Sequence, residues 1–354
     1  MSSAPRPQLV LPPSAVTSMA HLPAFVEHGG ELVGRHPATA VDARLYGFVL
    51  AADNDLLDRY CDRMFNGPAG GSTHWEAVGD EVLLNFVDIP TLGSGDLEDM
   101  QLGTFSEREV AIWFPVTDKV QDRFAWAVPY MFVDSDQAMA GGREVYGFPK
   151  QLGTINFDVD DAAPALLTVD TVTLRSYAPD ASAETCRVAK VELPGVPSPL
   201  GPAWTEPAQA LRDVIRAAGL SKRPTSGPVP GAAAAGRAAA PPRFPDVRSE
   251  LQFFEHLVAE DLPMLLLKQF RDAHQQGAAC YQAIVLADME VSLFRGGGLL
   301  PNGYHVTVGQ LDGEPIIREL GVAPSSEPRA AFWLEFDFVI RLGTLLWEWP
   351  GARR

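Results

Sequence analysis

The segment "GREVYGFPKQLG" (142–153) places Lys150 directly after a Gly-Phe-Pro run and just before a strand-like stretch. A lysine amine is a nucleophile only when it is unprotonated, which at neutral pH requires a pKa well below its usual value of about 10.4. Burial among apolar groups lowers the pKa because it penalises the ammonium form. The chain offers apolar candidates for such a pocket in Tyr146, Phe148, Met131 and Phe132. Most lysines are nevertheless solvated, so the residue types alone favour a surface charge.

Short segments rich in branched and aromatic residues surround this lysine on both sides in the chain. Ten of them alternate or run apolar as β-strands do: 44–50, 81–89, 110–116, 123–133, 154–160, 165–174, 187–193, 287–294, 303–308 and 332–340. Helical spacing occurs at 54–65 and at 206–220, where Thr205 is a candidate N-cap. Many short period-two segments predict an α+β chain that is mainly antiparallel β, closed as a barrel or packed as a sandwich.

Two stretches lack such a pattern. Residues 1–38 are rich in proline and weakly patterned, and we interpret them as a loose N-terminal arm. Residues 224–245 are almost entirely Pro, Gly and Ala, which cannot pack a core. This stretch separates two domains near residue 235, or it is a long surface loop inside one domain. The residues alone leave both possibilities open.

Composition restricts the partners and the compartment. The net charge of −17 argues against nucleic acid and anionic membranes as partners, because both repel an acidic protein. No histidine or cysteine spacing predicts a metal site, and no phosphate-binding loop opens a helix, so we expect no metal and no cofactor. No apolar run is long enough to span a bilayer and the first residues do not read as a signal peptide. We therefore expect a cytoplasmic protein.

The segment "AMAGGREVYGFPKQLG" (138–153) resembles the signature of the acetoacetate decarboxylase superfamily, in order and in spacing. Weaker similarity extends over most of residues 40–345, on both sides of the Pro/Ala/Gly stretch. The resemblance implies a cone-shaped β-barrel with a few peripheral helices. It also implies one domain at 39–350, interrupted by an insertion at about 196–248 whose flexible part is 221–247.

The resemblance also implies roles for individual residues. Lys150 matches the lysine that forms a Schiff base, and Glu107 matches a catalytic glutamate, with Glu109 as the alternative if the alignment shifts by two. Arg44 lies within one residue of an arginine that would hold the substrate carboxylate. The expected substrate-binding residues are Arg44, Phe148, Met131, Phe132, Asn85 and Gln151.

Two positions depart from the pattern of the family's decarboxylases. Gln151 stands where they carry a second lysine, and Asn85 where a glutamate is expected. The resemblance therefore predicts a cofactor-free, homo-oligomeric lyase that acts on a small β-keto or α-oxo acid through an imine on Lys150, most simply by decarboxylation. An aldolase or dehydratase that uses the same lysine, and a non-catalytic binder of an apolar molecule, are the alternatives.

Overall fold

Strands dominate the chain, as the period-two patterns predict. A computed structural model describes residues 25–26, 34–195, 198–201, 204–218 and 261–353. The predicted arm (1–38) and insertion (196–248, with 221–247 as its flexible part) lie largely outside these described residues, so both stay predictions.

The elements follow one another with short connections over the described ranges. The strands are β1 (Ala38–Ala51), β2 (Trp75–Ala77), β3 (Glu81–Ser94), β4 (Thr104–Asp118), β5 (Arg123–Val133), β6 (Lys150–Leu152), β7 (Thr154–Asn156), β8 (Leu166–Thr173), β9 (Glu184–Glu192), β10 (Asp261–Arg271), β11 (Ala279–Leu299), β12 (His305–Val308), β13 (Ser325–Ser326), β14 (Ala330–Ile340) and β15 (Thr344–Glu348). The α-helices are α1 (Asn54–Cys61), α2 (Gly67–Ala69), α3 (Asp136–Gly141), α4 (Pro207–Ala217) and α6 (Ile316–Leu320). Single π or 3₁₀ turns occur at η1 (Asp62–Asn66), η2 (Asp99–Leu102), η3 (Gly142–Tyr146) and η4 (Pro350–Arg353).

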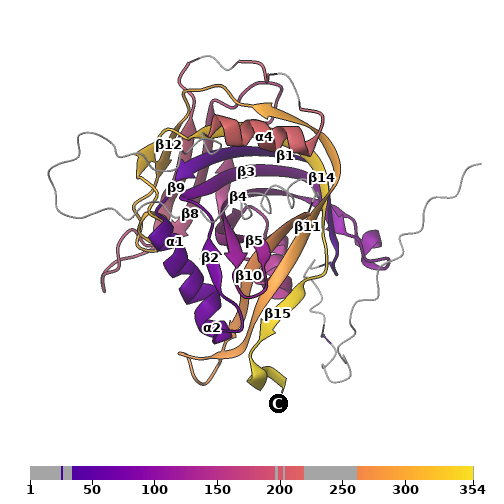
Figure 1. Cartoon of the computed structure of the whole chain (residues 1–354), viewed down its shortest axis with the longest axis vertical. Helices are drawn as coiled ribbons and strands as arrows, with labels where there is room; N and C mark the ends of the chain where they lie inside the picture. Colours follow the sequence, from indigo (N-terminus) through magenta and orange to yellow (C-terminus); the bar gives the residue numbers. More distant parts are fainter. Residues whose placement is uncertain (1–24, 27–33, 196–197, 202–203, 219–260, 354) are drawn as a thin grey trace, which may run out of the picture. The chain divides into compact units, whose positions relative to one another are not determined.

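Seven strands close into a ring. Within a ten-stranded sheet, pairing runs through β4, β3, β1, β14, β11, β10 and β5, and β5 pairs back with β4 (Figure 1). Every junction of the ring is antiparallel except β10 with β5. Strand β6 extends the sheet beside β5 in parallel register. The α+β, mainly antiparallel prediction is confirmed, and the closed pairing is the connectivity that a barrel requires.

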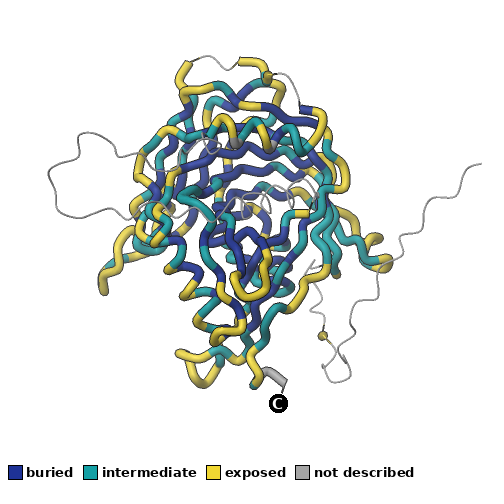
Figure 2. Tube along the Cα trace, viewed as in Figure 1, coloured by how far each residue is buried: buried dark blue, intermediate teal, exposed yellow. Residues whose placement is uncertain are grey.

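The two faces of the ring strands carry different buried clusters. On one face, residues such as Phe86, Val110 and Phe132 pack in one cluster with Leu167 and Val191 of a second, five-stranded sheet (β13-β12-β9-β8-β7). A ring of seven strands cannot enclose a five-stranded sheet, so this is the outer face. The opposite, inner face carries a separate cluster drawn from all seven ring strands. Figure 2 shows the ring strands as largely buried, with exposure gathered at loops.

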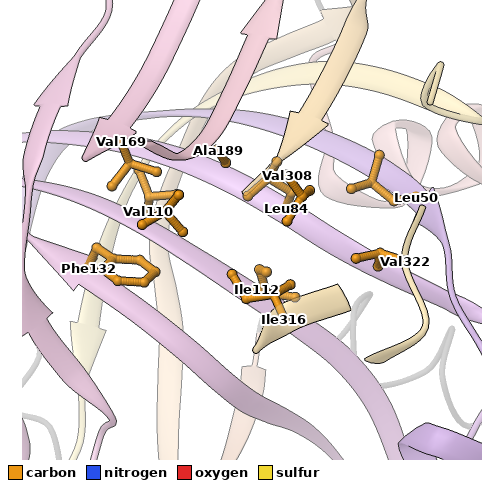
Figure 3. A pocket seen from close by; sticks show the side chains of 11 residues that line it. Leu50, Leu84, Val110, Ile112, Phe132, Val169, Ala189, Val308, Ile316 and Val322 are labelled. Atoms are coloured by element: carbon orange, nitrogen blue, oxygen red, sulfur yellow. The ribbon is translucent and has the colours of Figure 1, made fainter. Parts of the chain in front are cut away.

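A small apolar cavity lies between the outer face and the second sheet (Figure 3). It encloses about 10 Å³, and its lining includes Leu84, Ile112, Phe132, Val169 and Val308. A cavity of this size holds at most one water, and this lining offers water no polar partner. It is a packing defect of the core and gives no support to the binding of an apolar ligand.

Both predicted helices form, and one of them begins at a different residue than expected. Residues 54–65 fold as α1 followed by the π turn η1, and Asp53 caps α1 by accepting from the Leu56 N–H. Helix α4 begins one residue later than expected, with Glu206 rather than Thr205 at the N-cap position and no side-chain cap. Pro207 at the first helical position explains this start, because its fixed φ suits a helix and its missing N–H would have no partner within the helix.

A glycine ends the turn that leads to Lys150. Gly147 follows η3 with φ +88°, and a Cβ placed on it would lie 2.5 Å from Cα of Lys268 in β10. Only glycine combines this backbone conformation with such a close approach to a neighbouring strand. Gly147 therefore fixes how the η3 turn sits against the ring just before the lysine.

Replacement of Gly147 by alanine is expected to lower the free energy of unfolding by about 2–5 kcal/mol. About 1–2 kcal/mol comes from the left-handed backbone and about 1–3 kcal/mol from the clash with β10. Gly70→Ala is the matched control, because Gly70 also has positive φ (+58°) but nothing within 4 Å of its added Cβ. Denaturant unfolding of both variants measures the difference, and equal losses would show that β10 yields without cost.

Candidate active site

Lys150 opens strand β6 on the inner face of the ring. Its Cα is paired with that of Met131 in β5, and the residue is only 7% exposed. The preceding η3 turn supports it: the Arg143 guanidinium donates to the Lys150 carbonyl oxygen at 2.9 Å. Gly142 leaves room for the lysine side chain, since a Cβ there would lie 2.8 Å from Lys150 Cδ. The lysine of the signature is thus a buried residue.

Two carboxylates from β4 meet the lysine amine. Lys150 Nζ lies 2.8 Å from Glu107 Oε1, to which it donates a hydrogen bond, and 3.8 Å from Glu109 Oε2. Both glutamates are buried, with 2% and 8% exposure. Their spacing explains the geometry, because residues two apart on a strand share a face. The site is therefore a buried cluster of one ammonium and two carboxyl groups.

The charges of this cluster oppose one another. Burial lowers the pKa of Lys150, but the nearby Glu107 and Glu109 raise it, and the net direction is upward. This corrects the expectation that an apolar pocket depresses the pKa, because the apolar walls also enclose two carboxyl groups. In the unliganded protein the amine is an ammonium ion paired with Glu107.

Glu109 has a strongly shifted pKa. Burial raises it, the Lys150 charge lowers it and Glu107 raises it, giving a pKa of about 7. A carboxyl group with this value exchanges its proton near neutral pH, which suits it to acid–base chemistry. The site therefore holds a buried lysine amine, a carboxylate hydrogen-bonded to it and a carboxyl group that titrates near neutral pH.

Aromatic rings flank the amine. Lys150 Nζ lies 5.8 Å from the Phe148 ring centroid, and Phe148 packs edge-on against Tyr146 at 5.7 Å. The His36 ring packs edge-on against the Tyr146 ring, with 4.8 Å between the ring centroids. Burial, followed by the charge of Lys150, lowers the pKa of His36 to about 4, so this imidazole is neutral at physiological pH.

The structure brings part of the predicted set together. Lys150, Glu107, Phe148, Met131 and Asn85 lie on the inner face, with Phe148 and Met131 in its apolar cluster. Glu109, considered only as an alternative to Glu107, lies beside it. Both glutamates therefore reach the lysine.

Three predicted residues lie on the other face. Phe132 belongs to the outer cluster and lines the small cavity of Figure 3. Gln151 donates to Glu314 Oε2 at 3.0 Å, beyond the outer side of the ring. Arg44 alternates with Leu45 of the inner face, and its guanidinium pairs with Glu335 and donates to the Asp160 carbonyl. The structure does not bring these three side chains to Lys150.

Sequence reasoning missed His36, which lies near the site, and Trp113, which lies on the same inner face. His36 precedes β1 in the region interpreted as an arm, and its contact with Tyr146 has no signature in the sequence. Trp113 lies on the inner face two residues beyond Ala111. Its position could have been found by extending the period-two alternation of β4 from Glu107 and Glu109.

The arrangement supports proton transfer coupled to nucleophilic attack. The Glu107 carboxylate is within hydrogen-bond distance of the ammonium and can accept its proton, which leaves a neutral amine in a buried site. The same carboxyl group can return the proton to a departing oxygen.

None of the described helices is long and apolar enough to cross a membrane.

Comparison with known proteins finds one family model that matches part of the chain. The family model described as acetoacetate decarboxylase matches residues 78–185, a range that contains Asn85, Glu107, Glu109 and Lys150 but not Arg44. No curated protein matches the chain.

Several solved structures share the fold. The acetoacetate decarboxylase from Legionella pneumophila subsp. pneumophila str. Philadelphia 1 has a TM-score of 0.55 and 14% identity, over 94% of each chain. The enduracididine biosynthesis enzyme MppR, complexed with the condensation product of pyruvate and imidazole 4-carboxaldehyde, has a TM-score of 0.52 and 15% identity, over 90% of this chain and 92% of that one. An acetoacetate decarboxylase-like enzyme from Sphingomonas wittichii RW1 has a TM-score of 0.50 and 12% identity, over 89% and 94%.

At these identities the structural likeness shows the fold alone, and the family match covers the strands and the turn that carry the candidate site. The resemblance to the acetoacetate decarboxylase superfamily is confirmed: residues 78–185 match its family model, and the chain has the fold of its enzymes.

Proposed function

We propose that the protein is a Schiff-base-forming lyase that acts on a β-keto or α-oxo acid through an imine on Lys150, and that its reaction is the decarboxylation of a β-keto acid. One observation carries the proposal: a buried lysine amine that donates to Glu107 at 2.8 Å, inside an acetoacetate decarboxylase match. Glu107 takes the ammonium proton, and the neutral amine attacks the substrate ketone. Glu107 passes the two protons that the nitrogen loses to the ketone oxygen. The oxygen departs as water and leaves an iminium ion.

The iminium ion then acts as the electron sink. In the imine of a β-keto acid, the bond between the α-carbon and the carboxylate breaks, and its electron pair forms an enamine with the adjacent iminium carbon as CO₂ departs. A carboxyl group of the cluster protonates the enamine carbon, and water releases the ketone product and the lysine. Arg44 takes no part, because its guanidinium is paired with Glu335 on the outer face.

An aldolase or dehydratase is the second candidate, and Glu109 is the observation that favours it. Decarboxylation needs one proton returned to carbon. An aldol step also needs a proton removed from the substrate's α-carbon and one given to the aldehyde oxygen, and dehydration needs a hydroxyl protonated. A second carboxyl group with a pKa of about 7, 3.8 Å from the amine, supplies such an acid–base group.

Borohydride reduction in the presence of a keto acid is expected to leave a stable adduct on Lys150, located by mass spectrometry. Lys150→Ala should abolish it, because the imine can no longer form. Lys268→Arg is the matched control: Lys268 is a half-buried lysine whose pKa burial lowers, which makes it the competing nucleophile. An adduct that survives in Lys150→Ala and disappears in Lys268→Arg would contradict the assignment. A protein that traps no keto acid at all would behave as the non-catalytic binder.

Carbon dioxide release separates the two reactions. With a panel of β-keto acids, we expect the wild-type protein to release CO₂ at a rate that Lys150→Ala reduces by at least about a hundredfold. Pyruvate with an aldehyde serves as the second assay, followed by chromatography of the condensed product. Condensation without CO₂ release from any β-keto acid would reject decarboxylation and leave the aldolase.

Glu109 predicts a dependence of stability on pH. Its folded pKa of about 7 is raised above the ordinary value of 4.5, so the folded protein binds this proton more tightly than the unfolded chain. The resulting stabilisation is complete below about pH 4.5 and is lost as the pH rises through about 7. Relative to Glu109→Gln, which stays uncharged, the wild-type protein should therefore lose unfolding free energy between about pH 5 and 8.

Urea unfolding across this pH range measures the difference. Glu327→Gln, at an exposed glutamate, is the control and should leave the pH profile of the wild-type protein unchanged. A constant difference between wild type and Glu109→Gln would show that Glu109 does not titrate in this range.

A further inference from the structure

Asn85 lies on the inner face in one row with the nucleophile. Cross-strand pairing joins Gly47 to Asn85, Asn85 to Ala111, Ala111 to Met131, and Met131 to Lys150. Asn85 is completely buried, with 0% exposure. Its neighbours in the row offer no polar side-chain atom, because one is a glycine and the other an alanine.

Both polar atoms of this amide are unsatisfied. Asn85 Nδ2 and Oδ1 are buried and have no hydrogen-bond partner among the residues that the structure describes. The same is true of Nε1 of Trp113, which lies two residues beyond Ala111 on β4 and on the same inner face. A buried amide without partners costs free energy, and leucine of similar size would avoid that cost. A group that binds there and pairs with these atoms accounts for their presence.

The position sets how far this group lies from the imine. Glu109, whose Oε2 lies 3.8 Å from the lysine amine, is two residues along β4 from Ala111, the partner of Asn85. At about 3.3 Å per residue this backbone separation is roughly 7 Å. The occupant is therefore a group of the substrate that lies beyond the carbon bound to Lys150.

The charges nearby select an uncharged group. Glu109 pairs with Val87, the next inner-face residue along β3 from Asn85, so an anion at Asn85 would face a carboxyl group that ionises near pH 7. Lys150 is already paired with the two glutamates. The amide supplies both a donor and an acceptor, and the indole adds a donor. A neutral group that both donates and accepts satisfies all of them.

We propose that Asn85 and Trp113 form a subsite for a hydroxyl or carboxamide group at the end of the substrate remote from Lys150. This inference rests on the proposed function, because it assumes an imine at Lys150. It assigns the substrate class as an oxo acid with a neutral hydrogen-bonding terminus. A terminal methyl would leave the amide unpaired, and a terminal carboxylate would place a second anion near the Glu109 carboxyl group.

Reductive trapping tests this with linear 2-oxo acids of increasing length, each with a terminal methyl, hydroxyl, carboxamide or carboxylate. The readout is the concentration that gives half-maximal adduct on Lys150. At the length that reaches the subsite, the hydroxyl or carboxamide acid should need about tenfold less than the methyl acid. Asn85→Leu should bring this ratio close to one. Trp113→Phe, which removes the N–H and keeps an aromatic ring, should lower it at least about threefold.

The outcomes distinguish this inference from the function beneath it. If wild type traps pyruvate but shows no preference among termini, the subsite is rejected and the imine chemistry stands. If the carboxylate acid binds best, the assignment to a neutral group is wrong. If no oxo acid is trapped, the proposed function fails and this inference fails with it. Should Asn85→Leu not fold, an unchanged ratio in Trp113→Phe still overturns the subsite.

Discussion

The ion cluster of Lys150, Glu107 and Glu109 is the constraint to which the rest of the ring must conform. Burying three ionisable groups costs several kcal/mol per ion, and the cost is repaid only when the partners are held at hydrogen-bond distance. The Nζ-to-Oε1 distance of 2.8 Å to Glu107 meets this condition, and Glu109 moderates its own cost by raising its pKa. The pairing favours the ammonium over the reactive amine. Reaction therefore requires the proton to move within the cluster, which the shared hydrogen bond permits.

The ring holds this cluster through strand β5. Strand β4 pairs with one edge of β5 and β6 with the other, so the glutamates and the lysine stand on either side of Met131. Two strand spacings are about 10 Å, which only long side chains extending toward each other can bridge. Lysine and glutamate have that reach, whereas aspartate in place of Glu107 would fall short. The side-chain lengths thus follow from the sheet order.

The alternation of residues predicted the strands well because each strand buries one face against its own cluster, as Leu45 and Tyr46 show by dividing between the inner and outer faces. The signature segment identified Lys150, and the period of two placed Glu107 and Glu109 on one side. The alternation did not predict which residues of neighbouring strands pair with each other. Arg44 is close to the expected motif position, yet the pairing of β1 with β14 aligns it with Glu335 on the outer face. Nor could any local pattern predict that His36 meets Tyr146, because that contact depends on the folded path of the chain.

The alternation also changes the significance of Gln151. A lysine at this position would follow the nucleophile in sequence, but successive residues of a strand point to opposite faces. Gln151 reaches Glu314 on the outer side, while Lys150 reaches Glu107 on the inner side. The residue at 151 is therefore remote from the Lys150 amine. The charged groups that act on this amine are the carboxyl groups of Glu107 and Glu109. The departure with consequences for the substrate is at Asn85, whose unpaired amide faces the same interior as the lysine. In the reaction and subsite that we propose, chemistry at the amine depends on β4, and recognition of the rest of the substrate depends on β3 and β4 together.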